Sequence, residues 1–192
     1  MSSDFGYVNA RVRGMASRLL GRETFQAALD AQDFRAFTAL LDQTPYASAL
    51  DEARAGASGL RVVDRALAQA FHATTRRMLA FADGAPRDVI AALLRHYDLE
   101  DLKTIARAQH AGRDPSELGE ALTGAGELRP ATLEALASAS DLPAAAQRLM
   151  AAGHPLATAF ANAARAYASD GDLLAFEVAL DQAFFASLSE FA

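Results

Sequence analysis

The sequence predicts an all-α protein built of two related helical subdomains, and three observations support this prediction. Alanine and leucine dominate the apolar residues, which recur at three- and four-residue spacing and nowhere alternate with polar residues as a half-buried strand requires. Capping residues and prolines divide the chain into helices of roughly 10–24 residues. Similar segments occur in both halves, so we place a first helical repeat at residues 1–97 and a second, incomplete repeat at residues 98–192.

The first half of the chain shows four helical patterns. An apolar face over residues 5–19 predicts a first helix that Gly21 ends. Asp33 precedes a second apolar face and is a predicted N-cap, and the hydroxyl group in "TPY" (44–46) predicts another helix start. Apolar residues at helical spacing over residues 60–81 predict one long helix.

The second half contains further helix starts, each at a capping residue or a proline. Gly84 is predicted to close the long helix that precedes them. The starts lie at Ala85–Pro86, Asp98, "DPSE" (114–117), Asp141, Gly153–Pro155 and Asp172.

An internal repeat connects the two halves. The segment "LLDQTPYASAL" (40–50) returns as "MAAGHPLATAF" (150–160), so that Pro45 matches Pro155. Three further matches pair "DFRAFTALL" (33–41) with "DLPAAAQRL" (141–149), "ALAQAF" (66–71) with "ALDQAF" (179–184) and, more weakly, "NARVR" (9–13) with "DLKTI" (101–105). A repeat of this length is a helical subdomain, because the units of a solenoid are shorter.

Composition narrows the classes of function. The formal charge of -6 and the pI near 5.2 argue against a nucleic-acid-binding protein, whose surface would be basic. The chain has no cysteine, which excludes disulfides, thiolate catalysis and thiolate zinc sites and fits a reducing compartment. No apolar run resembles a secretory signal or approaches the ~18 residues of a membrane span. We therefore expect a cytoplasmic protein without direct membrane insertion.

Four stretches stand in the order and at about the spacing that a known family shows. They are "YVNARVRGMASRLL" (7–20), "LLDQTPYASAL" (40–50), "YDLEDLKTIARAQHAG" (97–112) followed by "PSEL" (115–118), and "FEVALDQAFFASL" (176–188). Over nearly its whole length the chain thereby resembles the C subunit of bacterial and archaeal V-type (A-type) ATPases, whose eukaryotic counterpart is the d subunit. The resemblance implies three similar helical subdomains around a pseudo-threefold axis, arranged as a funnel-shaped socket.

This resemblance also implies a function. The socket of the family sits on the membrane rotor ring and receives the tip of a shaft made by the D and F subunits. The chain would then be a non-catalytic central-stalk subunit of a rotary ATPase, coupling the D–F shaft to the proteolipid ring for proton or sodium transport. It would be peripheral to the membrane at its cytoplasmic face, with no active site, cofactor or metal of its own. The alternative is a stand-alone helical scaffold that binds another soluble protein.

Two departures from the family bear on this interpretation. Asp101 stands where the second repeat of the family usually has asparagine, so the position lacks an amide donor. The chain holds one complete repeat and part of a second, and no counterpart of the third. Because two subdomains cannot close a threefold socket, this departure keeps the scaffold alternative open.

Three arginines of the predicted first helix are candidate partner contacts. At 100° per residue Arg11, Arg18 and Arg22 fall on one stripe beside the apolar face. One interpretation is structural: the side-chain stems cover the edge of the core while the guanidinium groups stay in water. The other is functional: the stripe binds acidic side chains or helix C-termini of a partner, because guanidinium groups pair well with carboxylates.

Histidines and acidic residues do not form a convincing metal site in the sequence. His96 and Glu100 could chelate a metal from one helix, but a helix start at Asp98 would separate them. His110 and His154 have no acidic or histidine partner at ligand spacing. The "SDGD" segment (169–172) lacks the further acidic positions of a calcium loop and is interpreted as a turn with Asp172 as a helix cap.

Two glycine-rich segments are interpreted as loops. "GASGL" (56–60) lacks the spacing of a nucleophile elbow, and no strand precedes it. "GEALTGAG" (119–126) places two glycines at phosphate-loop spacing, but Ala125 stands where the lysine would be required.

The last predicted helix carries apolar residues for which the second repeat has no following helix as cover. They are Leu180, Phe184, Phe185, Leu188 and Phe191. We therefore expect the isolated protein either to self-associate through its C-terminal helix or to fold that helix back onto the first repeat.

Overall fold

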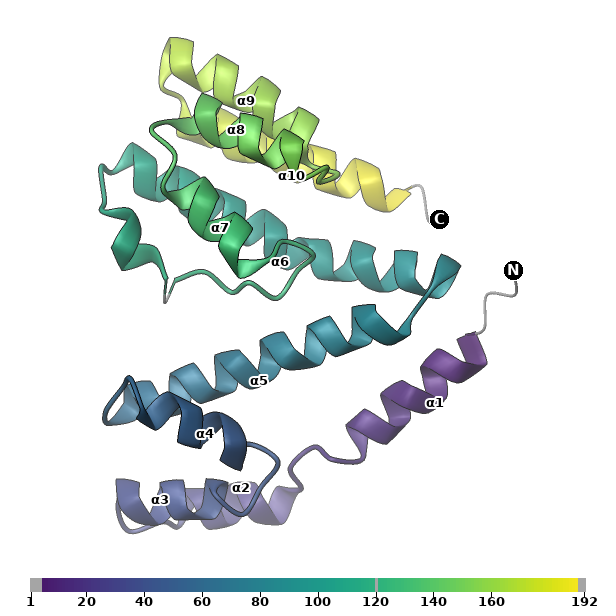
Figure 1. The fold of residues 1–192 in the computed structure, drawn as a ribbon, viewed down its shortest axis with the longest axis vertical. Coiled ribbons are helices and arrows are strands. Elements are labelled where there is room, and N and C mark those ends of the chain that lie inside the picture. The colour runs from purple at the N-terminus through teal and green to yellow at the C-terminus, as the bar shows by residue number, and fades with distance from the viewer. Residues whose placement is uncertain (1–4, 120, 190–192) are drawn as a thin grey trace. The chain divides into compact units, whose positions relative to one another are not determined.

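All regular elements of the structure, a computed structural model that describes residues 5–119 and 121–189, are helices. This confirms the predicted all-α fold. The chain divides into two compact units, unit 1 comprising Met1–Pro86 and unit 2 comprising Arg87–Ala192 (Figure 1). The boundary between the two sequence repeats, expected between residues 97 and 98, is a separate matter and stays a prediction.

Unit 1 contains five helices in its described part. They are α1 (Phe5–Ala16), α2 (Arg22–Leu29), α3 (Phe34–Leu41), α4 (Ala47–Arg54) and α5 (Leu60–Phe81). The first helix is shorter than predicted, because the amides of Arg18 and Leu19 bond to carbonyls three residues back and close tight turns. The 8-residue helix α2 follows, which the sequence did not predict.

The rest of the chain forms one long helix and a compact helical array. The elements are α6 (Gly84–His110), the 3₁₀ helix η1 (Pro115–Leu118), α7 (Pro130–Ala137), α8 (Leu142–Ala151), α9 (Ala157–Asp170) and α10 (Leu173–Ser189). Helix α6 runs 27 residues, so the expected helix start at Asp98 is wrong and helix lengths extend beyond the predicted range at both ends. Gly84, with a φ of 52°, opens α6 instead of merely closing α5.

Three of the predicted caps are confirmed. Asp33 Oδ1 accepts a hydrogen bond from the Ala36 amide at 2.7 Å, and Asp141 Oδ1 accepts one from the Ala144 amide at 2.7 Å. Asp172 Oδ1 does the same for Ala175 at 2.9 Å. Each bond satisfies an amide that has no partner within its own helix.

The sequence repeat extends to hydrogen bonds in the turns before α4 and α9. Thr44 Oγ1 accepts a hydrogen bond from the Tyr46 amide at 3.2 Å. Its counterpart His154 accepts one from the Leu156 amide at Nδ1, at 3.3 Å. The helices themselves begin later, at Ala47 and Ala157, so these side chains hold the entry turn and do not cap the helix.

The two units differ in how much core they build. In unit 1 a cluster of six buried apolar residues forms between α3, α4 and α5, and no residue of α1 belongs to it. In unit 2 the corresponding cluster has 23 members and includes residues of α6, α7, α8, α9 and α10. At its centre Phe160 and Phe176 meet edge to face with ring centroids 5.1 Å apart.

Helix α10 already has cover for part of its apolar surface. Leu180 and Phe184 are buried in the core of unit 2, so the expectation that they need another cover is wrong. Leu188 is half-buried against the same core, whereas Phe185 is 65% exposed. Phe191 lies outside the described residues.

Candidate functional site

The three candidate arginines do not share a helix. Arg11 lies on α1, Arg18 lies in the turn that follows, and Arg22 is the first residue of α2. The predicted stripe assumed one continuous helix and is wrong as geometry, because α1 ends at Ala16. All three side chains are nevertheless exposed.

Arg11 has a local role as well. Its guanidinium carbon lies 5.1 Å from the centroid of the Phe81 ring and 6.0 Å from that of Tyr7. The rings of Tyr7 and Phe81 meet edge to face at 6.4 Å. Arg11 therefore helps to hold α1 on the C-terminal end of α5 through cation–π attraction.

A groove of about 590 Å³ lies between α1 and the α4–α5 pair in unit 1. Val12 and Met15 of α1 form one wall, and Arg18 lies at the same groove. Gln69 of α5 also lines it, and its Oε1 atom is buried with no hydrogen-bond partner among the described residues. The groove thus combines apolar surface, a cation and an acceptor that lacks a donor.

In unit 2, two buried carboxylates on α6 hold the loop that follows η1. Asp101 Oδ1 accepts hydrogen bonds from the amide and the hydroxyl of Thr123, at 2.6 and 2.8 Å, and its Oδ2 accepts from the Gly124 amide at 2.8 Å. One turn earlier, Asp98 accepts from the amides of Glu127 and Leu128, at 2.8 and 3.0 Å. The glycine-rich loop therefore donates its amides to carboxylates of its own chain.

The aspartate at position 101, where the family usually has asparagine, is explained by these bonds. Both oxygens of the Asp101 carboxylate accept hydrogen bonds, and none of these bonds requires the amide donor that an asparagine would supply. Burial raises the pKa of Asp101 above its usual range, while the bonds from Thr123 and Gly124 partly offset that rise.

His154 completes the buried network, although sequence spacing gave it no partner. Its Nε2 lies 3.3 Å from Asp98 Oδ2, across 56 residues of chain. Because the Leu156 amide donates to Nδ1, the neutral ring carries its proton on Nε2 and donates it to Asp98. The pair joins α6 to the turn before α9.

Asp98 and His154, together with Glu127, form the only group of three candidate metal ligands among residues 5–119 and 121–189. Ligand atoms of Asp98, Glu127 and His154 lie within 4.8 Å of one another. However, both ring nitrogens of His154 are engaged within the chain, so neither offers a free lone pair. Arg95 Nη2 lies 3.7 Å from Glu127 Oε2, which further disfavours a cation. The geometry is that of a structural network.

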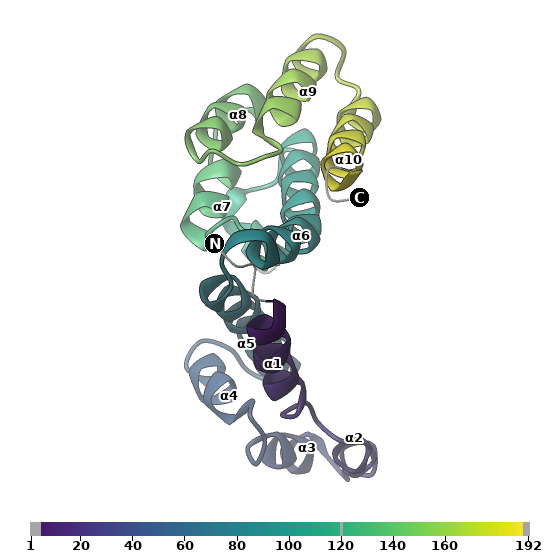
Figure 2. The ribbon, with the colours of Figure 1, turned by 90° about the vertical axis from the view of Figure 1, so that its right-hand side faces the viewer.

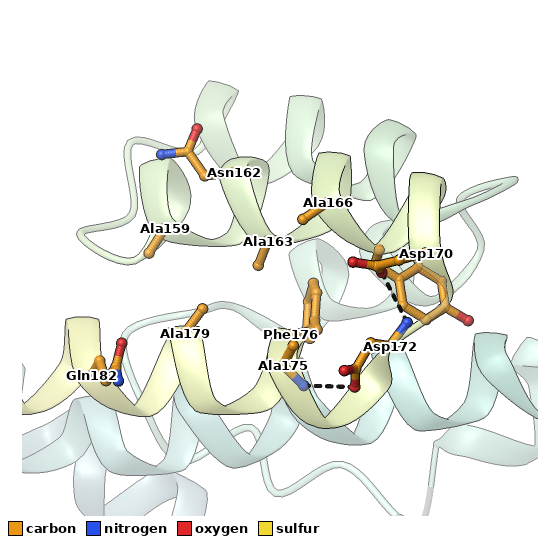
Figure 3. Close-up of a pocket in the computed structure, with 11 residues that line it drawn as sticks. Ala159, Asn162, Ala163, Ala166, Asp170, Asp172, Ala175, Phe176, Ala179 and Gln182 are labelled. Atoms are coloured by element: carbon orange, nitrogen blue, oxygen red, sulfur yellow. Dashed lines mark hydrogen bonds between the residues drawn. The ribbon is translucent and has the colours of Figure 1, made fainter.

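The structure also gives local roles to the other residues that the sequence offered as metal candidates. His96 and Glu100 do lie on one helix, contrary to the expectation of a break at Asp98, but the His96 ring packs against Phe184 at 6.1 Å. The "SDGD" segment forms the predicted turn: Asp170 Oδ1 accepts from the Asp172 amide at 2.9 Å, next to the cap on Ala175 (Figure 3). The adjoining pocket, of about 350 Å³, is lined by alanines together with polar and aromatic residues of α9, α10 and the turn between them.

Helices α6 and α10 lie side by side (Figure 2), and polar side chains connect them along their length. Arg107 pairs with Glu177 through two hydrogen bonds of 2.7 and 2.6 Å, and Lys103 forms an ion pair with Asp181. Arg95 Nη1 donates to Ser187 Oγ at 3.1 Å. The bond to Arg107 lowers the pKa of Glu177, and the bond to Glu177 raises the pKa of Arg107. These pairs connect the two helices at three points along their length.

No helix in the described ranges is long and apolar enough to cross a bilayer. In the part of the chain that the structure describes, the buried side chains of Asp98, His154 and Lys103 form hydrogen bonds or ion pairs within the chain.

Comparison with known proteins identifies a family. The family model described as ATP synthase (C/AC39) subunit matches residues 8–192. The C subunit of the V-type ATP synthase of Deinococcus radiodurans is 40% identical over 185 residues, which is 96% of this chain and 53% of that protein. The protein of the same name from Thermus thermophilus is 34% identical over the full chain and 56% of its own length.

An archaeal relative matches a shorter stretch. The C subunit of the A-type ATP synthase of Methanococcoides burtonii is 29% identical over 127 residues, or 66% of this chain and 35% of that protein. The chain spans about half the length of the first two relatives. It belongs to the ATP synthase (C/AC39) subunit family.

Proposed function

We propose that the chain is a non-catalytic central-stalk subunit of a rotary V/A-type ATPase, which couples the D–F shaft to the membrane proteolipid ring during proton or sodium transport. The observation that carries the proposal is the family match across residues 8–192. In this role the protein works on the cytoplasmic side, peripheral to the membrane, and has no active site or cofactor of its own.

The packing of unit 2 supports a mechanical role. A protein that transmits torque must resist deformation, and close-packed helices do so. The bonds from Arg107 to Glu177 and from Lys103 to Asp181 oppose sliding of α6 along α10. The buried pair of Asp98 and His154 ties α6 to the turn before α9, so that load on one helix reaches the others.

Partner contact is proposed for Arg11, Arg18 and Arg22. Their exposure leaves the guanidinium groups open to carboxylates of another protein of the complex. Reversing all three to glutamate should weaken assembly while the isolated chain stays folded. Exposed charges contribute on the order of 0–1 kcal/mol per pair, and the lost cation–π contacts of Arg11 cost about 0.5–1 kcal/mol. Reversal of Arg13, Arg35 and Arg61, which are exposed in the same unit, is the matched control. Unfolding of the first variant would assign its arginines to the core edge.

Co-purification from native membranes tests the proposal directly. The protein should be recovered with the shaft and ring proteins, and isothermal titration should detect no micromolar ATP binding to the isolated chain. Recovery with an unrelated soluble partner would favour the stand-alone scaffold, and tight ATP binding would contradict a purely mechanical role.

A further inference from the structure

The groove of unit 1 has the form of an unfilled helix seat. Figure 1 shows α1 meeting α5 near the C-terminal end of α5 and diverging from it towards the α2 side. The described contacts between these helices involve Tyr7 and Arg11 at Phe81. Farther along, the two helices form opposite walls of the groove of about 590 Å³.

Unit 2 shows how the corresponding place looks when it is filled. There α6, which precedes α7–α10 as α1 precedes α2–α5, contributes to the common core and is braced along α10. Three side-chain bonds, from Arg95, Lys103 and Arg107, follow its length. In unit 1 the core cluster of α3, α4 and α5 includes no residue of α1, although Val8 of α1 is itself buried. The occupant that suits the groove is therefore a helix.

The lining of the groove describes the helix that would fit. Val12, Met15 and Met78 offer apolar surface, and Arg18 and Arg77 offer positive charge. Glu52 is the single acidic residue of the lining. A suitable helix would be apolar on one face and acidic, and could donate a hydrogen bond to the buried Oε1 of Gln69.

Helix α10 offers such an apolar face. Leu174, Val178 and Phe185 are 72%, 42% and 65% exposed, and their spacing places them on one face of the helix. We call these three residues the α10 stripe. The ionisable residues of Leu173–Ser189 are Glu177 and Asp181, both acidic and both already paired within unit 2, with Arg107 and Lys103.

The two units differ in formal charge. Unit 1 has ten basic and nine acidic residues, a formal charge of +1, whereas unit 2 has eight and fifteen, a formal charge of -7; together they give the -6 of the chain. The groove thus lies on the nearly neutral unit and the α10 stripe on the acidic one, whereas two whole copies, at -6 each, repel one another at long range.

We propose that the groove of unit 1 binds the α10 stripe of a second copy of this chain, so that free copies associate head to tail. The proposal goes beyond the central-stalk role and is tested on the purified chain alone. Because Arg18 lines the groove and is also a proposed partner contact, self-association and assembly into a complex would exclude each other. A contact of helix-in-groove size is small, so the association is weak.

The test measures the mass of the intact chain by light scattering from about 10 to 500 μM, a range that covers weak association. The average mass should rise with concentration beyond that of a monomer. A monomer throughout this range would overturn the proposal, and so would the closing of α1 into its own groove, which leaves the chain monomeric.

Two variants locate the contact. Arg77→Glu alters the groove and Phe185→Ser the α10 stripe, and each should raise the dissociation constant at least about tenfold, which corresponds to 1.4 kcal/mol. Arg61→Glu, an exposed arginine of α5 outside the groove lining, is the matched control and should associate like the native chain. Circular dichroism checks that all variants remain helical.

Mixing the two variants gives the decisive result. The mixture contains one intact groove, on Phe185→Ser, and one intact stripe, on Arg77→Glu. It should form a 1:1 dimer that grows no further, because the remaining groove and stripe are both altered. If the mixture stays monomeric while the native chain associates, or if both variants associate like the native chain, the contact lies elsewhere and the proposal is wrong.

Discussion

At the scale of single residues, the loop amides that bind Asp98 and Asp101 show how closely this structure is packed. Gly126 lies so near to Asp98 that a Cβ atom added there would meet the carboxylate oxygen Oδ1 at 2.1 Å. The backbone can approach the buried carboxylate only because position 126 has no side chain. Glycine is thus required at position 126 because the Asp98 carboxylate leaves no room for a side chain, and not because of the backbone conformation of a turn.

Replacing Gly126 by alanine should therefore be costly. We expect a loss of about 2–4 kcal/mol in the free energy of unfolding, because the methyl group displaces Asp98 from the amides that it accepts. The control is Gly14→Ala in α1, where an added Cβ meets nothing within 4 Å and helix propensity improves by about 0.5–1 kcal/mol. Urea unfolding measures both, and equal stabilities would contradict the close approach.

The bond between Arg107 and Glu177 should make stability depend on pH. The folded pKa of Glu177 is lowered, so its contribution is present above the ordinary value near 4.5 and is lost as the pH falls through the folded pKa. Because Arg107 is half exposed, we expect Glu177→Gln to cost only about 0.5–1 kcal/mol at pH 7.

The measurement is urea unfolding of both proteins at pH 7 and pH 3. The difference between Glu177→Gln and the native chain should shrink at the lower pH. Glu134→Gln, an exposed glutamate of α7, serves as the control and should show little difference at either pH. A constant cost at both pH values would show that the carboxylate charge is not what matters.

At the scale of elements, equivalent helices of the repeat have different surroundings. Leu67 of α5 and Leu180 of α10 occupy matching places in "ALAQAF" and "ALDQAF". Leu180 is fully buried in the core of unit 2, whereas Leu67 is 44% exposed. The equivalent leucines therefore differ in burial, and only the one in unit 2 is part of a hydrophobic core.

This difference predicts unequal costs of truncation. Leu180→Ala should lower the free energy of unfolding by about 2–5 kcal/mol, because it opens a cavity among close-packed side chains. Leu67→Ala should cost less than about 1 kcal/mol, as expected for a largely exposed site. Thermal unfolding followed by circular dichroism compares them, and a larger cost at Leu67 would show that sequence equivalence outweighs burial.

At the scale of the whole molecule, core size should set the order of local opening. Six buried apolar residues form the core cluster of unit 1, against 23 in unit 2. Segments with few buried contacts open at lower free energy. Hydrogen exchange should therefore be faster for the amides of α3–α5 than for those of α8–α10. Equal protection in the two units would mean that they unfold as one cooperative body.

Local signals in the sequence were enough for the helical class and many helix ends. The caps at Asp33, Asp141 and Asp172 rest on short-range hydrogen bonds, which depend on residues three apart in the chain. The start expected at Asp98 failed because its carboxylate binds amides 29 and 30 residues away. The stripe of Arg11, Arg18 and Arg22 failed because α1 ends at Ala16. Only Arg11 lies on α1, while Arg18 lies in the following turn and Arg22 begins α2.

The sequence by itself thus determined the all-α class, the repeat and the family, because these depend on local propensity and on the order of segments. The tertiary structure alone decided the partners of the buried charges. No spacing rule links His154 to Asp98, which meet only because the turn before α9 packs on α6. The tertiary structure also decided that Phe184 is covered while Phe185 is not, since two adjacent residues on a helix point about 100° apart and only packing selects the buried one.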